Sequence, residues 1–194
     1  MRRTFTAMLI AVMLVAAGGL AGCDLLGNGN EDANALITAA NVHLKKHQAS
    51  DDKVRKLAEE LNALGITPAD ATKALTITAQ IKTELEAQRV ELAAASEQIA
   101  KIKTLDVDAT FKKYADLEVA ALKAQSAVVD KGLAIYAEMD KLYVAMRDGV
   151  ATTKLTEELS ANITAIAEEI KTLSDAASKE INTANTYFEK TAPK

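Results

Sequence analysis

From residue 31 onward, apolar residues recur in alternating steps of three and four, the spacing that places side chains on one face of an α-helix. This region is rich in Ala, Leu, Ile, Glu, Lys and Thr. It holds few helix breakers, namely Gly65, Pro68, Gly132, Gly149 and Pro193. Such a composition is typical of long helices. The pattern therefore predicts an all-α fold with four helices, over roughly residues 31–64, 68–104, 108–147 and 152–189.

The second of these stretches has the most regular pattern. Thr67-Pro68-Ala69-Asp70 is typical of a helix start, because the threonine can cap the helix, the proline suits its first position and the aspartate can complete a capping box. The residues that follow form an uninterrupted heptad seam: Ala71, Ala74, Thr78, Ile81, Leu85, Gln88, Leu92, Ala95, Ile99 and Ile102. We expect this seam to be buried between helices.

The other three stretches are less uniform. The first carries a stripe made of Leu36, Ala40, His43, His47, Ser50, Val54, Leu57, Leu61 and Leu64. Ala49-Ser50-Asp51-Asp52 interrupts it, which leaves open whether this stretch is one helix or two. Gly65 then suits the left-handed backbone of a helix C-terminus. The third stretch has two apolar sets, and such a broad face is typical of a bundle core.

The predicted helices are joined by about three to five residues, and connections this short favour antiparallel neighbours. We therefore expect an antiparallel up-down-up-down four-helix bundle of long, coiled-coil-like helices over residues 31–190. At 1.5 Å per residue it would be about 50–60 Å long. The alternative is a more open coiled-coil assembly that is completed by a second chain.

The first 22 residues have the parts of a secretory signal. Arg2 and Arg3 are followed by an apolar run from Ala7 to Ala17 and then by small residues. The apolar run is shorter than the roughly 20 residues that a membrane-spanning helix needs. Leu20-Ala21-Gly22-Cys23 ends the segment, and it resembles the lipobox of bacterial lipoproteins.

The resemblance implies that residues 1–22 are removed and that Cys23, the single cysteine of the chain, is lipidated with fatty acyl chains such as palmitate. It also implies a place in the bacterial cell envelope, anchored in membrane lipid on the extracytoplasmic face. Residues 24–30 then form a short tether that reaches no more than about 25 Å. Asp24 resembles the signal that retains lipoproteins of enteric bacteria in the inner membrane, and so favours the cytoplasmic membrane.

The charge of the chain argues against one class of partner. Removal of the leader takes away two arginines and lowers the net charge from −4 to −6. We expect no nucleic-acid partner, because an acidic chain without tryptophan lacks the basic face and the stacking rings of nucleic-acid binders. Residues 43–56 nevertheless carry a net charge of +3. This segment is either a solvated helix face or a contact for anionic lipid headgroups.

Two sets of polar residues are candidate sites. His43 and His47 lie one helical turn apart and are the candidate metal ligands. We expect neither a metal nor a cofactor, because the chain has no Glu-x-x-His pair and two lysines stand between the histidines. Gln88, Gln125 and Asn162 fall at or near seam positions, where buried amides either specify helix register or line a polar pocket.

Motifs for catalysis are absent from the sequence. It has no Gly-x-Ser-x-Gly, and the glycines beyond the leader and tether are isolated, which excludes a phosphate-cradling loop. We therefore do not expect an enzyme. The predicted function is a structural or protein-interaction bundle, with an envelope protein or the cell wall as its partner and self-association as a further option. The alternative is a ligand-binding or sensory bundle with a cavity around Gln88, Gln125 and Asn162.

Overall fold

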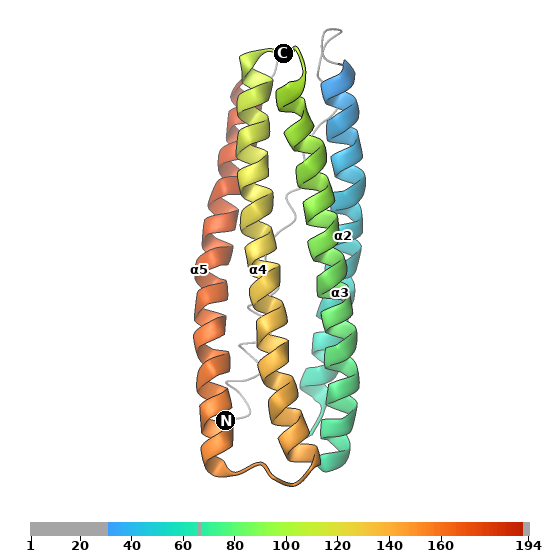
Figure 1. The fold of residues 1–194 in the computed structure, drawn as a ribbon, viewed down its shortest axis with the longest axis vertical. Coiled ribbons are helices and arrows are strands. Elements are labelled where there is room, and N and C mark those ends of the chain that lie inside the picture. The colour runs from blue at the N-terminus through green and yellow to red at the C-terminus, as the bar shows by residue number, and fades with distance from the viewer. Residues whose placement is uncertain (1–30, 66, 192–194) are drawn as a thin grey trace.

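The apolar pattern folds into four long helices, each of which runs antiparallel to the next along the chain (Figure 1). The structure is a computed structural model and describes residues 31–65 and 67–191. The helices are α2 (Glu31–Ala63), α3 (Pro68–Lys101), α4 (Ala109–Arg147) and α5 (Thr153–Thr191), and the 3₁₀ turn η1 (Ile102–Thr104) extends α3. The predicted all-α, up-down-up-down four-helix bundle is confirmed. Helices of 33 to 39 residues give a rod of about 50–60 Å.

Side-chain caps start three of the helices. Thr67 and Asp70 form the predicted capping box at α3, where the Asp70 amide donates to Thr67 Oγ1 at 3.2 Å and the Thr67 amide donates to Asp70 Oδ2 at 3.4 Å. Asp108 caps α4 by accepting from the Thr110 amide at 2.6 Å. Thr152 accepts from the Leu155 amide at 3.2 Å at the start of α5. These caps satisfy backbone donors that the first helical turn leaves free.

Two glycines end helices for different reasons. Gly149 has a φ of 70° and closes α4, with the Val150 amide donating to the Ala145 carbonyl at 2.9 Å in a Schellman arrangement. Gly65 was expected to adopt the same left-handed backbone, but this prediction is wrong. A Cβ atom at Gly65 would instead lie 2.5 Å from Asp70 Oδ2, so the residue is small to make room for the capping carboxylate.

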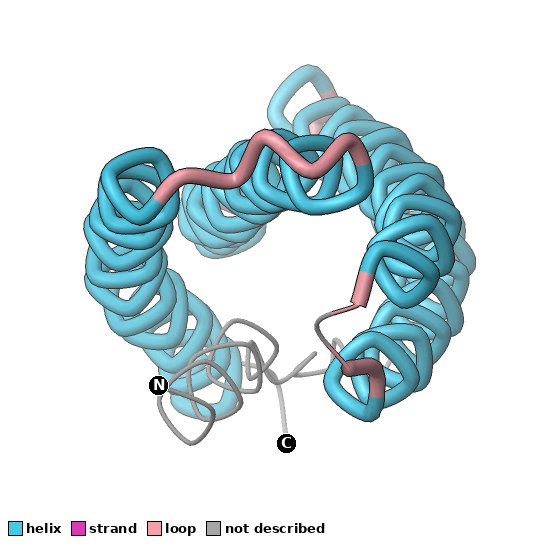
Figure 2. The backbone as a smooth tube through the Cα atoms, turned by 90° about the horizontal axis from the view of Figure 1, so that it is seen from below, coloured by secondary structure: helices cyan, strands magenta, loops and turns pink. Residues whose placement is uncertain are grey.

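The four helices form a curved row in which each packs on the next along the chain (Figure 2). In this row α3 and α4 each have two helical neighbours, whereas α2 and α5 occupy the two edges. Among the described helices, the two edge helices do not pack extensively against each other. The row therefore has two ends that a closed bundle would lack.

The seams of α2 and α3 differ in how well their pattern predicts burial. All ten predicted seam positions from Ala71 to Ile102 are buried. In contrast, the stripe predicted for the first half of α2 is only partly right. Ala40 and His47 are buried as predicted, but Leu36 and His43 are only half-buried, and Ala33 and Ile37 are buried instead. α2 is one continuous helix, and Ser50 lies buried within it.

The buried faces of α4 and α5 differ in breadth, because α4 is a central helix of the row and α5 is an edge helix. α4 buries a broad face that contacts α3 on one side and α5 on the other, in keeping with its two apolar sets. α5 buries far fewer residues, namely Leu159, Ile163, Ile170, Ala177 and Ala184. From Ile163 onward these recur every seven residues, which is the narrow stripe of a helix that packs against a single neighbour.

Candidate functional site: a polar cavity between three helices

A small cavity of about 30 Å³ lies between α2, α3 and α4, near the middle of the rod. Its apolar wall consists of Val54 from α2, Leu85 from α3, and Val128, Val129 and Gly132 from α4. Its polar wall consists of His47, Asp51, Gln88, Gln125 and Tyr136. Side chains from three helices that are far apart in the sequence thus converge on one point of the core.

Three polar atoms in this wall have no hydrogen-bond partner within residues 31–65 and 67–191: Gln88 Nε2, Gln125 Oε1 and the Tyr136 hydroxyl. The side chains that carry them belong to residues that are 3%, 6% and 1% exposed. Burial also raises the pKa of Tyr136, so its hydroxyl stays protonated and can donate a hydrogen bond. An unpaired buried polar group costs about 1–3 kcal/mol, so three of them around one cavity call for an explanation.

His47 forms part of this cavity wall and is only 6% exposed. Its burial agrees with its place in the stripe predicted for the first helix, but the pattern did not indicate that it faces a cavity. Burial lowers its pKa, because a charged imidazole is poorly solvated in the core, and the nearby Asp51 offsets part of this effect. His47 is therefore a neutral imidazole at pH 7.

His43 lies one turn before His47 on α2, is only half-buried, and pairs with α3. Its Nδ1 atom is 2.6 Å from Glu91 Oε2, and Lys46 Nζ is 3.8 Å from the other oxygen of the same carboxylate. The two histidines therefore belong to different environments, despite lying one turn apart. Within residues 31–65 and 67–191, no group of three or more His, Cys, Asp and Glu side chains is placed to hold a metal ion.

Of the three amides singled out in the sequence, Gln88 and Gln125 are brought together at the cavity and Asn162 is not. Asn162 lies exposed on α5, where its Nδ2 atom donates to Glu138 Oε2 at 3.4 Å. Its helix does not contribute to the cavity, whose walls come from α2, α3 and α4. The expected pocket around all three amides is therefore wrong for Asn162.

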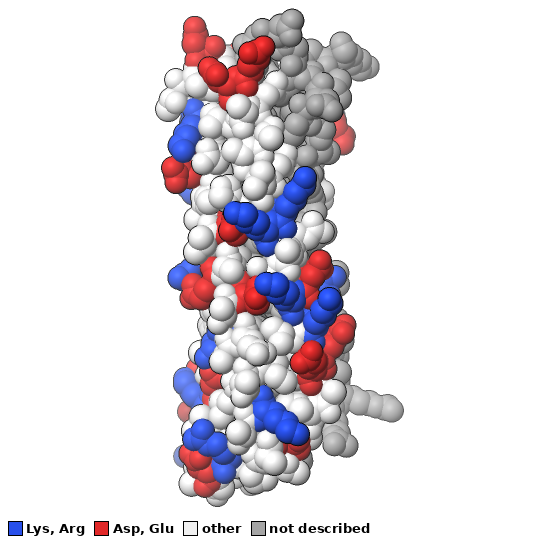
Figure 3. Space-filling view, turned by 90° about the vertical axis from the view of Figure 1, so that its right-hand side faces the viewer, with Lys and Arg blue, Asp and Glu red and all other residues white. Residues whose placement is uncertain are grey.

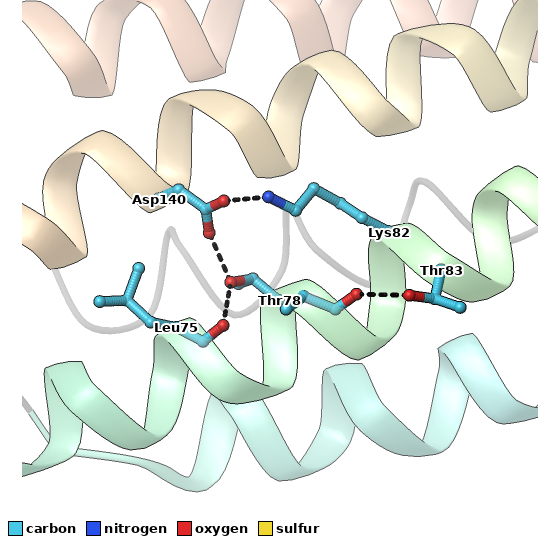
Figure 4. A network of polar contacts seen from close by, with 6 residues as sticks. Leu75, Thr78, Lys82, Thr83 and Asp140 are labelled. Atoms are coloured by element: carbon cyan, nitrogen blue, oxygen red, sulfur yellow. Dashed lines mark hydrogen bonds and ion pairs between the residues drawn. The ribbon is translucent and has the colours of Figure 1, made fainter.

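A second polar cluster joins α3 to α4 closer to the end of the rod (Figure 4). Asp140 of α4 pairs with Lys82 and accepts a hydrogen bond from Thr78 Oγ1 at 2.5 Å. The same hydroxyl lies 3.1 Å from the Leu75 carbonyl oxygen, so one proton has two acceptors. Thr78 is fully buried, which keeps any substrate from its hydroxyl. The arrangement can hold two helices in register, but it offers no accessible nucleophile.

Glu118 is a buried carboxylic acid that sequence reasoning missed. It is 5% exposed and lies on α4, and burial raises its pKa to about 7 despite a hydrogen bond from Tyr114. Tyr114 also packs against Phe188 of α5, with ring centroids 5.1 Å apart. The only signal in the sequence is that Glu118 stands seven residues before Gln125, in the same heptad column.

The basic segment of α2 is largely neutralised by neighbouring acids. Lys53 Nζ lies 3.0 Å from Glu84 Oε1 on α3, and Arg55 pairs with Asp51 at 2.5 Å. Figure 3 shows acidic and basic side chains interspersed along the face that α2 and α3 present. The segment is therefore not a uniform positive patch, and paired charges on an exposed surface contribute little stability.

The predicted lipidation site Cys23, the leader and the tether lie outside the described residues. No helix in the described part of the chain is long and apolar enough to cross a membrane. Comparison of the chain with protein-family models, with curated proteins and with solved structures finds no match.

Proposed function

We propose that the chain is a lipid-anchored lipoprotein of the bacterial cell envelope that acts as a structural or protein-interaction rod. Its anchor is membrane lipid, reached through acylated Cys23, with Asp24 favouring the cytoplasmic membrane. Its partner is an envelope protein or the cell wall. We do not assign it an enzymatic activity, a nucleic-acid partner or a cofactor.

The observation that carries the interaction role is the open row of helices. Within the part of the chain that the structure describes, α2 and α5 each pack extensively against one neighbouring helix. Each also keeps half-buried apolar side chains beside its buried stripe, such as Leu57 on α2 and Leu173 on α5. Coiled-coil-like edge helices with spare apolar surface are suited to pairing with a further helix.

The position of the tether supports a rod that projects from the membrane. The tether joins α2 at Glu31, at the same end of the rod as η1 and the end of α5. The basic segment begins at His43, twelve residues or about 18 Å along α2 from that end. An upright rod would keep these charges away from the headgroups, so their contact with lipid is not part of the proposal.

The anchor can be tested by metabolic labelling with a fatty acid. We expect wild-type protein to incorporate the label and to partition into detergent, whereas Cys23→Ala accumulates as unlabelled precursor. Cys23 carries the only thiol of the chain, so the substitution removes the acylation site without altering the helices. Equal labelling of both proteins would contradict the anchor.

The interaction role can be tested by photo-crosslinking in intact envelopes. A crosslinking amino acid at Thr172, on the exposed side of the edge helix α5, should give a discrete adduct. The matched control is Thr83, an exposed threonine of the central helix α3, which should give none. Adducts of equal yield at both positions, or at neither, would contradict a role for the edge.

The alternative function is a ligand-binding or sensory bundle, and the polar cavity is the observation that favours it. Its volume of about 30 Å³ is enough for one or two water molecules, each of which needs roughly 10–15 Å³. An organic ligand would require α2 to move away from α3 and α4. Detection of a bound metabolite after purification would favour this alternative over the interaction rod.

A further inference from the structure

We propose that the cavity between α2, α3 and α4 is an internal hydration site, which binds one or two water molecules through Gln88, Gln125 and Tyr136. This site is distinct from the lipid anchor and from the exposed surfaces of α2 and α5. It follows from the number of unpartnered atoms, their donor and acceptor chemistry, and the size of the space between them.

The three unpaired atoms require a bound molecule that can both donate and accept hydrogen bonds. Gln88 Nε2 is a donor, Gln125 Oε1 is an acceptor, and the Tyr136 hydroxyl can serve as either. A buried water molecule typically makes about three hydrogen bonds to polar groups that would otherwise be unsatisfied. Water therefore matches the wall in the number and in the kind of bonds required.

The size of the cavity selects water over larger polar molecules. A volume of about 30 Å³ exceeds the roughly 10–15 Å³ that one water molecule needs, and leaves room for at most two. Gly132 contributes to this space, because a Cβ atom there would approach the Leu85 methyl groups at 3.5 and 3.6 Å. The apolar remainder of the wall, such as Val54 and Val128, confines the occupant to the polar side.

His47 and Asp51 line the same cavity from α2, the helix that follows the tether. The neutral imidazole of His47 offers a further donor or acceptor to the bound water. Charged groups near it are Asp51 on its own helix and Arg55, which pairs with that aspartate. Bound water would thus link a polar position of α2 to amides of α3 and α4, and so favour one register of the three helices.

Oxygen-17 relaxation dispersion of the full chain counts internal water molecules with long residence times. We expect one or two such molecules in the wild type, and their loss in the triple variant Gln88→Leu, Gln125→Leu, Tyr136→Phe. The control Asn162→Ala removes an exposed amide of α5 and should leave the count unchanged. A wild type without long-lived water, or a triple variant that keeps the same count, overturns the proposal.

Xenon provides a second measurement that needs no variant. Dry apolar cavities bind xenon, whereas a hydrated polar cavity should exclude it. We expect xenon under pressure to leave the methyl resonances of Val128 and Val129 unshifted in the wild type. A shift of these resonances, or a co-purified small molecule that occupies the cavity in a high-resolution crystal structure, would overturn the assignment to water.

Discussion

At the scale of single residues, Glu118 has the most consequential environment. Its carboxyl group is buried on α4, and its pKa is raised to about 7 because the ionised form is poorly solvated there. In the unfolded chain the same group ionises near pH 4.5. Between these two values the folded chain holds a proton that the unfolded chain has lost, so the stability of the fold decreases as the pH rises through this window.

We predict that Glu118→Gln removes this pH dependence. The stabilisation relative to wild type should be small at pH 4.5 and should reach the order of 3 kcal/mol above pH 7, where the wild type must either bury a charge or bind a proton. Chemical denaturation at pH 4.5 and pH 8 measures the difference. Glu168→Gln, at an exposed position of α5, is the control and should leave the wild-type pH profile intact. Equal effects of Glu118→Gln at both pH values would contradict a buried acid.

The sequence predicts the polar residues of the core only in part. Gln88 could be placed inside because it stands in a seam whose steps of three and four continue without interruption on both sides of it. His47 could be placed on the right face of α2, but its burial depends on how closely α4 approaches across α3. Asn162 stands one position before the buried Ile163, and a rotation of one residue along the helix is enough to turn it out to solvent.

At the scale of secondary-structure elements, the apolar pattern predicts the buried face of α3 better than that of α2. α3 keeps alternating steps of three and four over all ten seam positions, so its buried face is predicted fully. The start of α2 has adjacent apolar residues, Leu36 and Ile37, which allow two overlapping stripes. Packing against α3 buries the stripe that includes Ile37. This outcome depends on contacts between helices, which cannot be predicted from the spacing of apolar residues within α2 alone.

Replacing Gly132, within α4, and Gly149, at its end, by alanine should change the stability of the protein in opposite directions. Gly132→Ala should stabilise the protein by about 1 kcal/mol, since it replaces a helical glycine and the added Cβ meets Leu85 at an ordinary contact distance of 3.5 Å. Gly149→Ala should destabilise it by about 1 kcal/mol, because the φ of 70° disfavours any residue with a Cβ. Thermal melts of both variants provide the measurement. Shifts of the same sign would contradict one of the two assignments.

At the scale of the whole molecule, helix number, order and direction follow from the sequence because the breakers are few and the connections short. The curvature of the row does not follow from it. Closure of a four-helix bundle requires that α2 and α5 meet, and α5 has a narrow buried stripe that one neighbour already occupies. The breadth of the apolar face on each helix therefore decides whether the row of helices closes into a ring. The sequence pattern predicts this breadth less directly than it predicts helix length.

The open row predicts an order of local stability. Opening an edge helix breaks one helix–helix interface, whereas opening α3 or α4 breaks two, so the edge helices should have the lower opening free energies. Native-state hydrogen exchange should therefore show faster exchange at the middle of α5, around Ile170, than at the middle of α4, around Val128. Both residues are buried in helices of 39 residues, which makes the comparison like for like. Equal protection of the two helices that persists on dilution would mean that α5 has a second neighbour within the same chain. Equal protection that is lost on dilution would instead mean that a second copy covers this edge.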